Sequence, residues 1–511
     1  MGRVVVTVML FTVLLICPSR KAFALEFFDG RLHEVKGSVQ QTLNYRTHQD
    51  DRSVKFSSFR TTMRLEGIYE LIKPDTTCWN ASLYGLFNYW YDNGTNIDHD
   101  LKDTIILENG SSNYLKSYKR SNQQYEIMKE LYFEYSRGGF TSRLGKQMVS
   151  WGETAEARVA DVINPLDYNN FVAFPDWEDY KIGLWMGRFF YTPPASKLGL
   201  SYELIVIPAD FQYNQMPPAG SGLFFGSPMG TTFNLPFGVL YYPDFVGQIL
   251  NQQRHDAPSS NNTEIGGRIR GQNWSTDWTL STFYGRLDSP IYDGPEGAAN
   301  VTNMILNRAR NELGVALPKS KEGRIFTYPY YLSSAITFAR PWSWAKSVIR
   351  GEVVLNSGRE YNQAPTNTIV TRELLTTAVS WDRKNMIPYF SYWNRSRSVG
   401  SSLTWYHYKL FGFEKGINWE AGKDGLKQST WDKLTLVLDT GFYFDVITTG
   451  LSMSYDANEA NTIVGFIKFA PGNHWRWQVT YQQTNESDDA KGKDIGRYQN
   501  QLMFSMRYEF D

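Results

Sequence analysis

The chain has 511 residues, with 52 basic and 52 acidic side chains and a mean hydropathy of −0.42. The equal charges give no reason to expect a nucleic-acid or other polyanion partner, and no apolar stretch long enough for a membrane helix follows residue 16. Aromatic residues still make up 15% of the chain, a combination typical of membrane β-barrels, in which half of each strand faces water.

The first 24 residues form a secretory signal. Met1 to Arg3 carries a positive charge, Val4 to Ile16 is an apolar run broken by two threonines, and Ala22 to Ala24 offers small residues for cleavage. The run is too short for a spanning helix of about 20 residues, so an uncleaved anchor is the weaker interpretation. We therefore predict a signal over 1–24, cleavage near Ala24 and one domain over 25–511. The predicted location is the outer membrane of a Gram-negative bacterium.

Alternating apolar residues predict an all-β fold, a transmembrane antiparallel barrel with long extracellular loops and an inward-folded segment. The last strand shows the pattern best, because its alternate residues from Leu502 to Phe510 are all apolar or aromatic. We find 19 strand candidates, whereas such a barrel needs an even number, so we expect 16 or 18 strands with the doubtful region between Asn385 and Phe444. The candidates are 35–45, 59–69, 79–91, 125–135, 140–148, 182–190, 198–206, 265–271, 274–284, 331–338, 348–355, 369–381, 387–393, 404–413, 431–438, 446–455, 462–469, 474–481 and 500–510.

Short and long connections alternate between the first twelve candidates, as expected if short turns lie in the periplasm and long loops outside. A soluble sandwich has no reason for this regularity. The predicted long loops are 92–124, 149–181, 209–263, 288–325 and 356–367. We expect residues 303–313 to form a short helix that caps the fourth of these loops. Cys78, the one cysteine outside the signal, is predicted to be a packed wall residue.

The most distinctive stretch is Gly145-Lys146-Gln147-Met148-Val149-Ser150-Trp151-Gly152-Glu153, followed by Asn164-Pro165-Leu166-Asp167. It resembles the Gly-Arg-Gln-x-Val-x-Trp-Gly-Glu and Asn-Pro-x-Asp signature of an uncharacterised family of proteobacterial outer-membrane barrels, distantly like alginate-export and porin barrels. Lys146 stands where that family often has arginine. The resemblance implies a barrel fold, and some relatives are thought to work beside lipid-exporting pumps of the resistance-nodulation-division class.

This stretch predicts a charged elbow that folds into the lumen. Glycine and proline mark its turns, and its carboxylates need basic partners or water wherever they are buried. We expect those carboxylates to meet arginines of the wall at a constriction; the alternative is a structural lock without solute contact. The candidate residues are Arg60, Arg64, Arg143, Arg188, Trp151, Gly152, Glu153, Asp161, Asn164, Pro165 and Asp167.

A second candidate is the apolar insert between residues 209 and 260, which is rich in proline, glycine and aromatic residues. It predicts either a plug or path for hydrophobic solutes, or a loop that packs on itself and shields the barrel mouth. Its marked residues are Pro217, Pro218, Leu223, Phe224, Phe225, Phe233 and Phe237.

Catalysis is not expected, because the six histidines show neither a metal-ligand spacing nor a serine two residues on, and no cofactor motif is present. A plugged active receptor is also excluded, since strands begin soon after the signal. We predict an outer-membrane channel or export-route barrel for hydrophobic or amphiphilic molecules, in contact with outer-membrane lipid and with a pump or periplasmic carrier as partner. The alternatives are a general or anionic-polysaccharide porin, and a surface barrel whose loops bind a partner.

Overall fold

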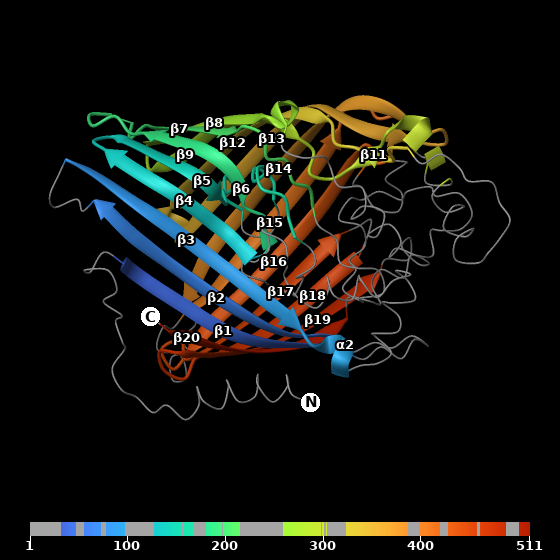
Figure 1. Ribbon diagram of the computed structural model, residues 1–511. Helices are drawn as coiled ribbons and strands as arrows, with labels where there is room; N and C mark the ends of the chain where they lie inside the picture. The colour runs from blue at the N-terminus through green and yellow to red at the C-terminus, as the bar shows by residue number, and fades with distance from the viewer. Residues whose placement is uncertain are drawn as a thin grey trace.

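The computed structural model is a closed antiparallel barrel of 18 strands, with a separate two-stranded hairpin above one part of the wall (Figure 1). The structure describes residues 32–46, 56–72, 78–97, 127–154, 158–167, 180–196, 198–214, 259–297, 299–300, 303, 323–386, 398–419, 428–456, 460–486 and 500–510. Everything below refers to these residues.

Every barrel strand pairs with its neighbours in chain order, apart from the inserted hairpin β10 and β11. The barrel strands are β1 (Leu32–Arg46), β2 (Phe56–Ile72), β3 (Trp79–Asp92), β4 (Met128–Arg137), β5 (Phe140–Gln147), β6 (Leu184–Tyr191), β7 (Ser201–Ile207), β8 (Glu264–Asn273), β9 (Thr276–Arg286), β12 (Tyr330–Trp342), β13 (Ser347–Gln363), β14 (Thr368–Met386), β15 (Ser398–Leu410), β16 (Thr430–Phe442), β17 (Ile447–Asp456), β18 (Ala460–Phe469), β19 (Trp475–Glu486) and β20 (Gln501–Phe510). The hairpin is β10 (Ile291–Tyr292) with β11 (Phe326–Thr327), and the short helix α2 (Gly94–Ile97) follows β3.

The barrel closes because the last strand pairs with the first over ten residues, from Gly37 opposite Phe510 to Arg46 opposite Gln501. The predicted fold and the upper strand count of 18 are therefore confirmed. Eighteen of the 19 candidates correspond to barrel strands. The extra candidate, 387–393, lies outside the described residues, and β14 pairs directly with β15, which leaves no place for a strand between them.

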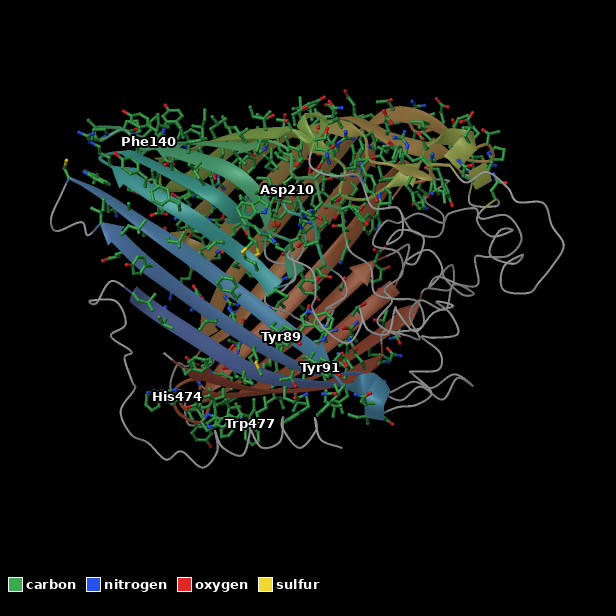
Figure 2. All side chains as sticks on the ribbon, viewed as in Figure 1. Tyr89, Tyr91, Phe140, Asp210, His474 and Trp477 are labelled. Atoms are coloured by element: carbon green, nitrogen blue, oxygen red, sulfur yellow. The ribbon has the colours of Figure 1, made fainter. Side chains whose placement is uncertain are left out.

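Side chains alternate between the outside of the wall and the lumen, as the period of two requires. In β20 the apolar residues Leu502, Phe504 and Phe510 are exposed on the outside, whereas Met503 and Ser505 face inward and are buried. The same outward exposure recurs around the wall, for example at Trp477, which stands out from the barrel in Figure 2. An apolar outer surface is what a wall in contact with lipid needs.

Short turns gather at one end of the barrel, which we name the turn end, and longer connections at the other, the loop end. At the turn end, β8 and β9 are joined by two residues, Trp274 and Ser275, and β4 and β5 by Gly138 and Gly139. The predicted alternation holds for four of the five long loops. The fifth, 356–367, is wrong, because β13 and β14 continue through it to a tight turn at 364–367.

This error has a physical reason. The part of β13 beyond Asn356 is polar and begins with a register shift at Gly358, so the apolar alternation stops although the hydrogen-bonded ladder goes on. The extension is stabilised by a cluster of Tyr361, Leu374, Leu410, Ile417 and Trp419. With 17 and 19 residues, β13 and β14 are consequently among the longest strands of the wall.

Cys78 is exposed just before β3, so its prediction as a packed residue is wrong. Cys78 precedes the first residue of β3, Trp79, and so lies outside the strand. Among the described residues, no helix is both long and apolar enough to cross a membrane.

Candidate functional site

The elbow, residues 148–167, leaves the wall at the loop end of β5 and enters the barrel. Val149, Trp151 and Ile163 pack on inward-facing residues of β6, β7 and β9, all of them at most 3% exposed. We name this group the apolar lumen cluster; its members are Val149, Trp151, Ile163, Leu184, Met186, Ile205, Ile207 and Phe283. An apolar patch on the inner face of a barrel departs from the usual polar lumen.

The elbow then extends along the inner wall beyond β9, which pairs directly with β12. Val159 and Ala160 pack against inward-facing residues of four other strands, β12 to β15. These are Ala335, Val354, Ala378 and Tyr406. The elbow therefore lies against the inner wall from β6 to β15, inside the barrel, and narrows the lumen there.

A buried carboxylate of the wall holds the middle of the elbow in place. Glu352 of β13 has no exposed surface, and its Oε1 accepts hydrogen bonds from the backbone N–H groups of Glu153 and Thr154 and from the Thr154 hydroxyl. Its Oε2 accepts the N–H of Ala160 at 2.9 Å. Gly152 lies so close that a Cβ there would be 3.3 Å from Glu352 Oε1. Four donors on one ionised group make this a strong attachment.

A chain of ion pairs ties the elbow to its own flanks. Asp161 Oδ2 lies 2.6 Å from Lys181 Nζ and 3.7 Å from Arg158 Nε, and Arg158 Nη1 lies 3.6 Å from Asp288. Lys181 also donates to the carbonyl of Val149 at 2.8 Å. Burial lowers the pKa of Lys181, and the charge of Asp161 opposes that shift.

The Asn164-Pro165-Leu166-Asp167 part of the elbow bonds to the chain that leads into β6. Asn164 is fully buried and its side-chain amide bonds to three backbone groups. The carbonyl of Pro165 accepts the N–H of Ile182 at 2.9 Å, and the N–H of Asp167 donates to the Tyr180 carbonyl at 2.7 Å. Asn164 thus acts through its side chain, whereas Pro165 and Asp167 make backbone bonds, and Asp167 is buried at 1% exposure.

Below the elbow, toward the turn end, charged side chains cross five neighbouring strands on the lumen face. We name them the charged row: Glu134, Arg143, Arg188, Glu203 and Arg268. Arg143 Nε lies 2.6 Å from Glu134, Arg188 pairs with Glu203, and Arg268 Nε donates to Glu203 at 2.7 Å. Arg143 also lies over the rings of Tyr132 and Phe190, so aromatic faces border the row.

The structure pairs the elbow carboxylate of Asp161 with partners other than the predicted Arg60, Arg64, Arg143 and Arg188. Asp161 pairs with Lys181 and Arg158, and the side chain of Glu153 is exposed while its backbone bonds to Glu352. The arginines pair with carboxylates of their own wall region instead: Arg60 with Asp92 at 3.4 Å, and Arg64 with Glu66 at 3.5 Å. The strand ladder places Arg60 directly opposite Asp92 and Arg143 directly opposite Glu134, so these pairs lie on one face of the wall within reach of each other.

Sequence reasoning missed Glu352, Arg158, Lys181, Glu203 and Arg268. The alternation in their strands could have placed Glu352, Glu203 and Arg268 on the lumen face, since each is followed by an outward apolar residue, Val353, Leu204 and Ile269 respectively. Their partners could not be predicted from the sequence, because the contact between Glu352 and the elbow joins residues almost 200 positions apart.

Two sequence predictions cannot be placed. The apolar insert from residue 215 to 258, with all its marked residues, and most of the helix predicted over 303–313 lie outside the described residues. Within the described part of the chain, no group of three or more histidine, cysteine or acidic side chains could hold a metal ion.

A sequence-family model described as "Protein of unknown function (DUF1302)" matches residues 5–303, more than half of the chain, and includes the elbow and the charged row. The chain belongs to this DUF1302 family. Membership agrees with the resemblance seen at the elbow signature. No match was found among curated proteins.

Solved structures similar to this DUF1302 protein are outer-membrane porins. They include OccK2 (OpdF) of Pseudomonas aeruginosa in complex with glucuronate, at 8% identity and a TM-score of 0.45, covering 93% of this chain and 97% of that one. OmpF of Salmonella typhi in complex with daunomycin has 9% identity and a TM-score of 0.41, covering 95% and 99%. OccAB3 of Acinetobacter baumannii has 7% identity and a TM-score of 0.46, covering 93% and 98%. The fold described above rests on the strand pairings of this chain itself.

Proposed function

We propose that this protein is an outer-membrane channel for amphiphilic solutes that carry an anionic head and an apolar tail. The turn end faces the periplasm and the loop end faces outward. A periplasmic carrier or pump that delivers such a solute to the turn end would be its partner. The elbow forms the constriction.

One observation carries this proposal: the charged row and the apolar lumen cluster adjoin each other. Arg268 belongs to the row through its bond to Glu203, and its guanidinium lies 5.2 Å from the ring centre of Trp151, a member of the cluster. It also donates to the carbonyl of Ser150 in the elbow at 3.5 Å. A solute at this place would meet charge on the turn-end side and apolar surface beside the elbow.

The net positive charge of the charged row favours a solute with an anionic head group. Three arginines face two glutamates, which leaves one positive charge in excess, and arginine recognises carboxylate and phosphate groups through paired N–H donors. Arg143 is the accessible member, because its side chain is 33% exposed whereas Arg268 is 3% exposed. The head would therefore meet Arg143 first.

The same arginines also support a second function, an anionic-polysaccharide or general porin. A polymer of sugar acids would use the row but would gain little from the apolar lumen cluster, because its surface is polar on all sides. The two functions therefore differ in how much an apolar tail on an anionic solute should strengthen its binding.

Planar-bilayer recording of the refolded protein tests the proposal. We expect decanoate to reduce the ion current at far lower concentration than acetate, because its tail adds burial worth about 0.8 kcal/mol for each CH₂. The variant Arg143→Gln should weaken the decanoate effect. Arg350→Gln, which removes a wall pair with Asp382 on β13 and β14, is the matched control and should leave the effect unchanged.

Equal action of decanoate and acetate would reject the amphiphile channel. Stronger block by oligomeric uronate than by decanoate would favour the polysaccharide porin. A refolded protein that never conducts and never binds decanoate would favour the surface barrel.

A further inference from the structure

The wall is unusually low at β5, β6 and β7, which we name the low wall. These strands have 8, 8 and 7 residues, against 17 and 19 in β13 and β14. At about 3.3 Å per residue and a tilt of about 40°, seven or eight residues rise about 18 to 20 Å, less than an apolar band of about 25 Å. In Figure 1 these strands end well before the tall strands do. The ladder therefore stops within the height that lipid covers.

Where the ladder between β5 and β6 stops, a side chain takes its place. The last ladder pair is Gln147 opposite Leu184. Beyond it, Asn164 Oδ1 accepts the N–H of Val149 at 2.7 Å, and Asn164 Nδ2 donates to the carbonyls of Ile182 at 2.8 Å and Gln147 at 3.2 Å. The side-chain amide of Asn164 thus lies between the two strand ends and makes the hydrogen bonds that a peptide group would make in a continued ladder.

We name the boundary between two neighbouring strands a seam. The next seam, between β6 and β7, is closed in the same way. Between β6 and β7 the last pair is Gly187 with Val206, and beyond it the N–H of Trp185 donates to Asp210 Oδ2 at 2.8 Å. Figure 2 places Asp210 between the turn end, marked by Phe140, and the far end of the tall strands. A bond from a loop side chain can be released without breaking any ladder pair, so these seams can open locally.

Apolar surface lies on both sides of the low wall. Outside, Leu144, Trp185 and Leu204 are 40% to 48% exposed, and Trp185 is the residue at which β6 has already separated from β7. Inside lies the apolar lumen cluster. A second inward-facing apolar group lies on β12 to β15 under Val159 and Ala160. Polar residues face inward at many other positions of the wall; examples are Thr42, Asn44, Thr376, Ser380, Thr404, Thr435, Thr480, Gln482 and Ser505.

We infer that the seam between β5 and β6 is a lateral route through which an acyl chain passes between the apolar lumen cluster and the outer leaflet, with Asn164 as its latch. The inference rests on the proposed function, because it gives the apolar tail of an amphiphile a direct path into lipid. An apolar tail that leaves sideways never crosses the water beyond the loop end, which avoids the cost of exposing it.

Photo-crosslinking in phosphatidylcholine liposomes tests the route. The photoreactive residue p-benzoylphenylalanine replaces Trp151 in the apolar lumen cluster or, as a matched control, the similarly buried Tyr406 of β15, a strand that does not adjoin the boundary between β5 and β6. After illumination, lipid adducts are measured by mass. We expect adducts at position 151 and none at position 406, with a several-fold higher yield at position 151 when Asn164→Ala opens the seam.

Two further variants keep the test decisive. Asn362→Ala removes another buried amide, which bonds to both backbone groups of Tyr292 away from the seam, and should not change the yield. Asp210→Ala loosens the adjoining seam at a partly exposed position and replaces Asn164→Ala if that variant fails to fold. No adduct at position 151 in any folded variant would overturn the lateral route, as would equal yields at 151 and 406. Decanoate block of the ion current is measured separately, so the proposed function can stand where the route fails.

Discussion

At the scale of single residues, the buried carboxylate of Glu352 decides where the elbow lies. The side chain accepts four hydrogen bonds from three elbow residues, and no basic group is needed to hold it because the donors are backbone N–H groups and a hydroxyl. A glutamine has the same shape but presents an N–H group where one oxygen was. It would therefore face at least one elbow donor with another donor.

We expect Glu352→Gln to loosen the elbow. The free energy of unfolding should fall by about 1 to 3 kcal/mol, since a buried donor loses a bond to a charged acceptor. Single-channel currents should become larger and noisier as the constriction moves. Urea unfolding in vesicles and bilayer recording check the two effects.

Glu360→Gln is the matched control, because Glu360 lies on the same strand but beyond the elbow, in the tall extension. Its currents should match those of the unmodified protein. Quiet currents of normal size from Glu352→Gln would show that the apolar contacts of Val159 and Ala160 alone hold the elbow.

At the scale of the strands and turns, the turn between β8 and β9 is under backbone strain. Its two residues, Trp274 and Ser275, have φ of 49° and 57°, in the left-handed region that a two-residue hairpin turn requires. Asparagine and glycine occupy such positions at the lowest cost, whereas a bulky aromatic residue is rare there. The Trp274 side chain is 85% exposed, so little packing offsets the strain.

Replacing both residues, Trp274→Asn with Ser275→Gly, should raise the free energy of unfolding by about 1 kcal/mol. The control Trp344→Asn removes another exposed indole, at 80% exposure, from a turn residue without a positive φ. Urea unfolding in vesicles compares the three proteins. A double variant less stable than the control would mean that the Trp274 indole is anchored at the membrane interface strongly enough to outweigh the strain.

Most elements of this fold could be predicted from the sequence, and the exceptions share a cause. The alternation of apolar and polar residues locates a strand only where one face is apolar. It therefore predicted β20 but not the polar extension of β13 beyond Asn356. The elbow could be recognised by its signature, but its partners could not. Glu352 and Lys181 become neighbours of the elbow only through closure of the barrel and the path of the chain inside it.

At the scale of the whole molecule, the barrel has two unlike sides. On one side, β5 to β7 have only seven or eight residues, the lumen face carries the apolar lumen cluster and the elbow emerges; on the other, β13 and β14 have 17 and 19 residues. This asymmetry matters only if the outer surface is immersed in lipid all round. Both proposals place the apolar face of each strand in lipid and the other face in the lumen.

A pair of adjacent residues tests that assignment. Leu403 of β15 is exposed on the outer surface, directly opposite Leu436 and Trp381, while Ser402 faces the lumen and donates to Asp382 at 2.6 Å. Arginine at the centre of a lipid-facing strand costs about 2 to 4 kcal/mol, because the guanidinium loses its water. Arginine at the lumen position keeps water and gains a nearby carboxylate.

We therefore expect Leu403→Arg to lower the free energy of unfolding in vesicles by about 2 to 4 kcal/mol and Ser402→Arg to change it by less than about 1 kcal/mol. The same two variants in detergent should differ less, since detergent tails rearrange around a charge more easily than a bilayer does. If Ser402→Arg were the more destabilising variant in vesicles, the face now assigned to the lumen would be the lipid-facing one in every strand of the wall. A shift of one residue exchanges the two faces of a strand. The elbow, the charged row and the low wall would then have to be interpreted again from the lipid side.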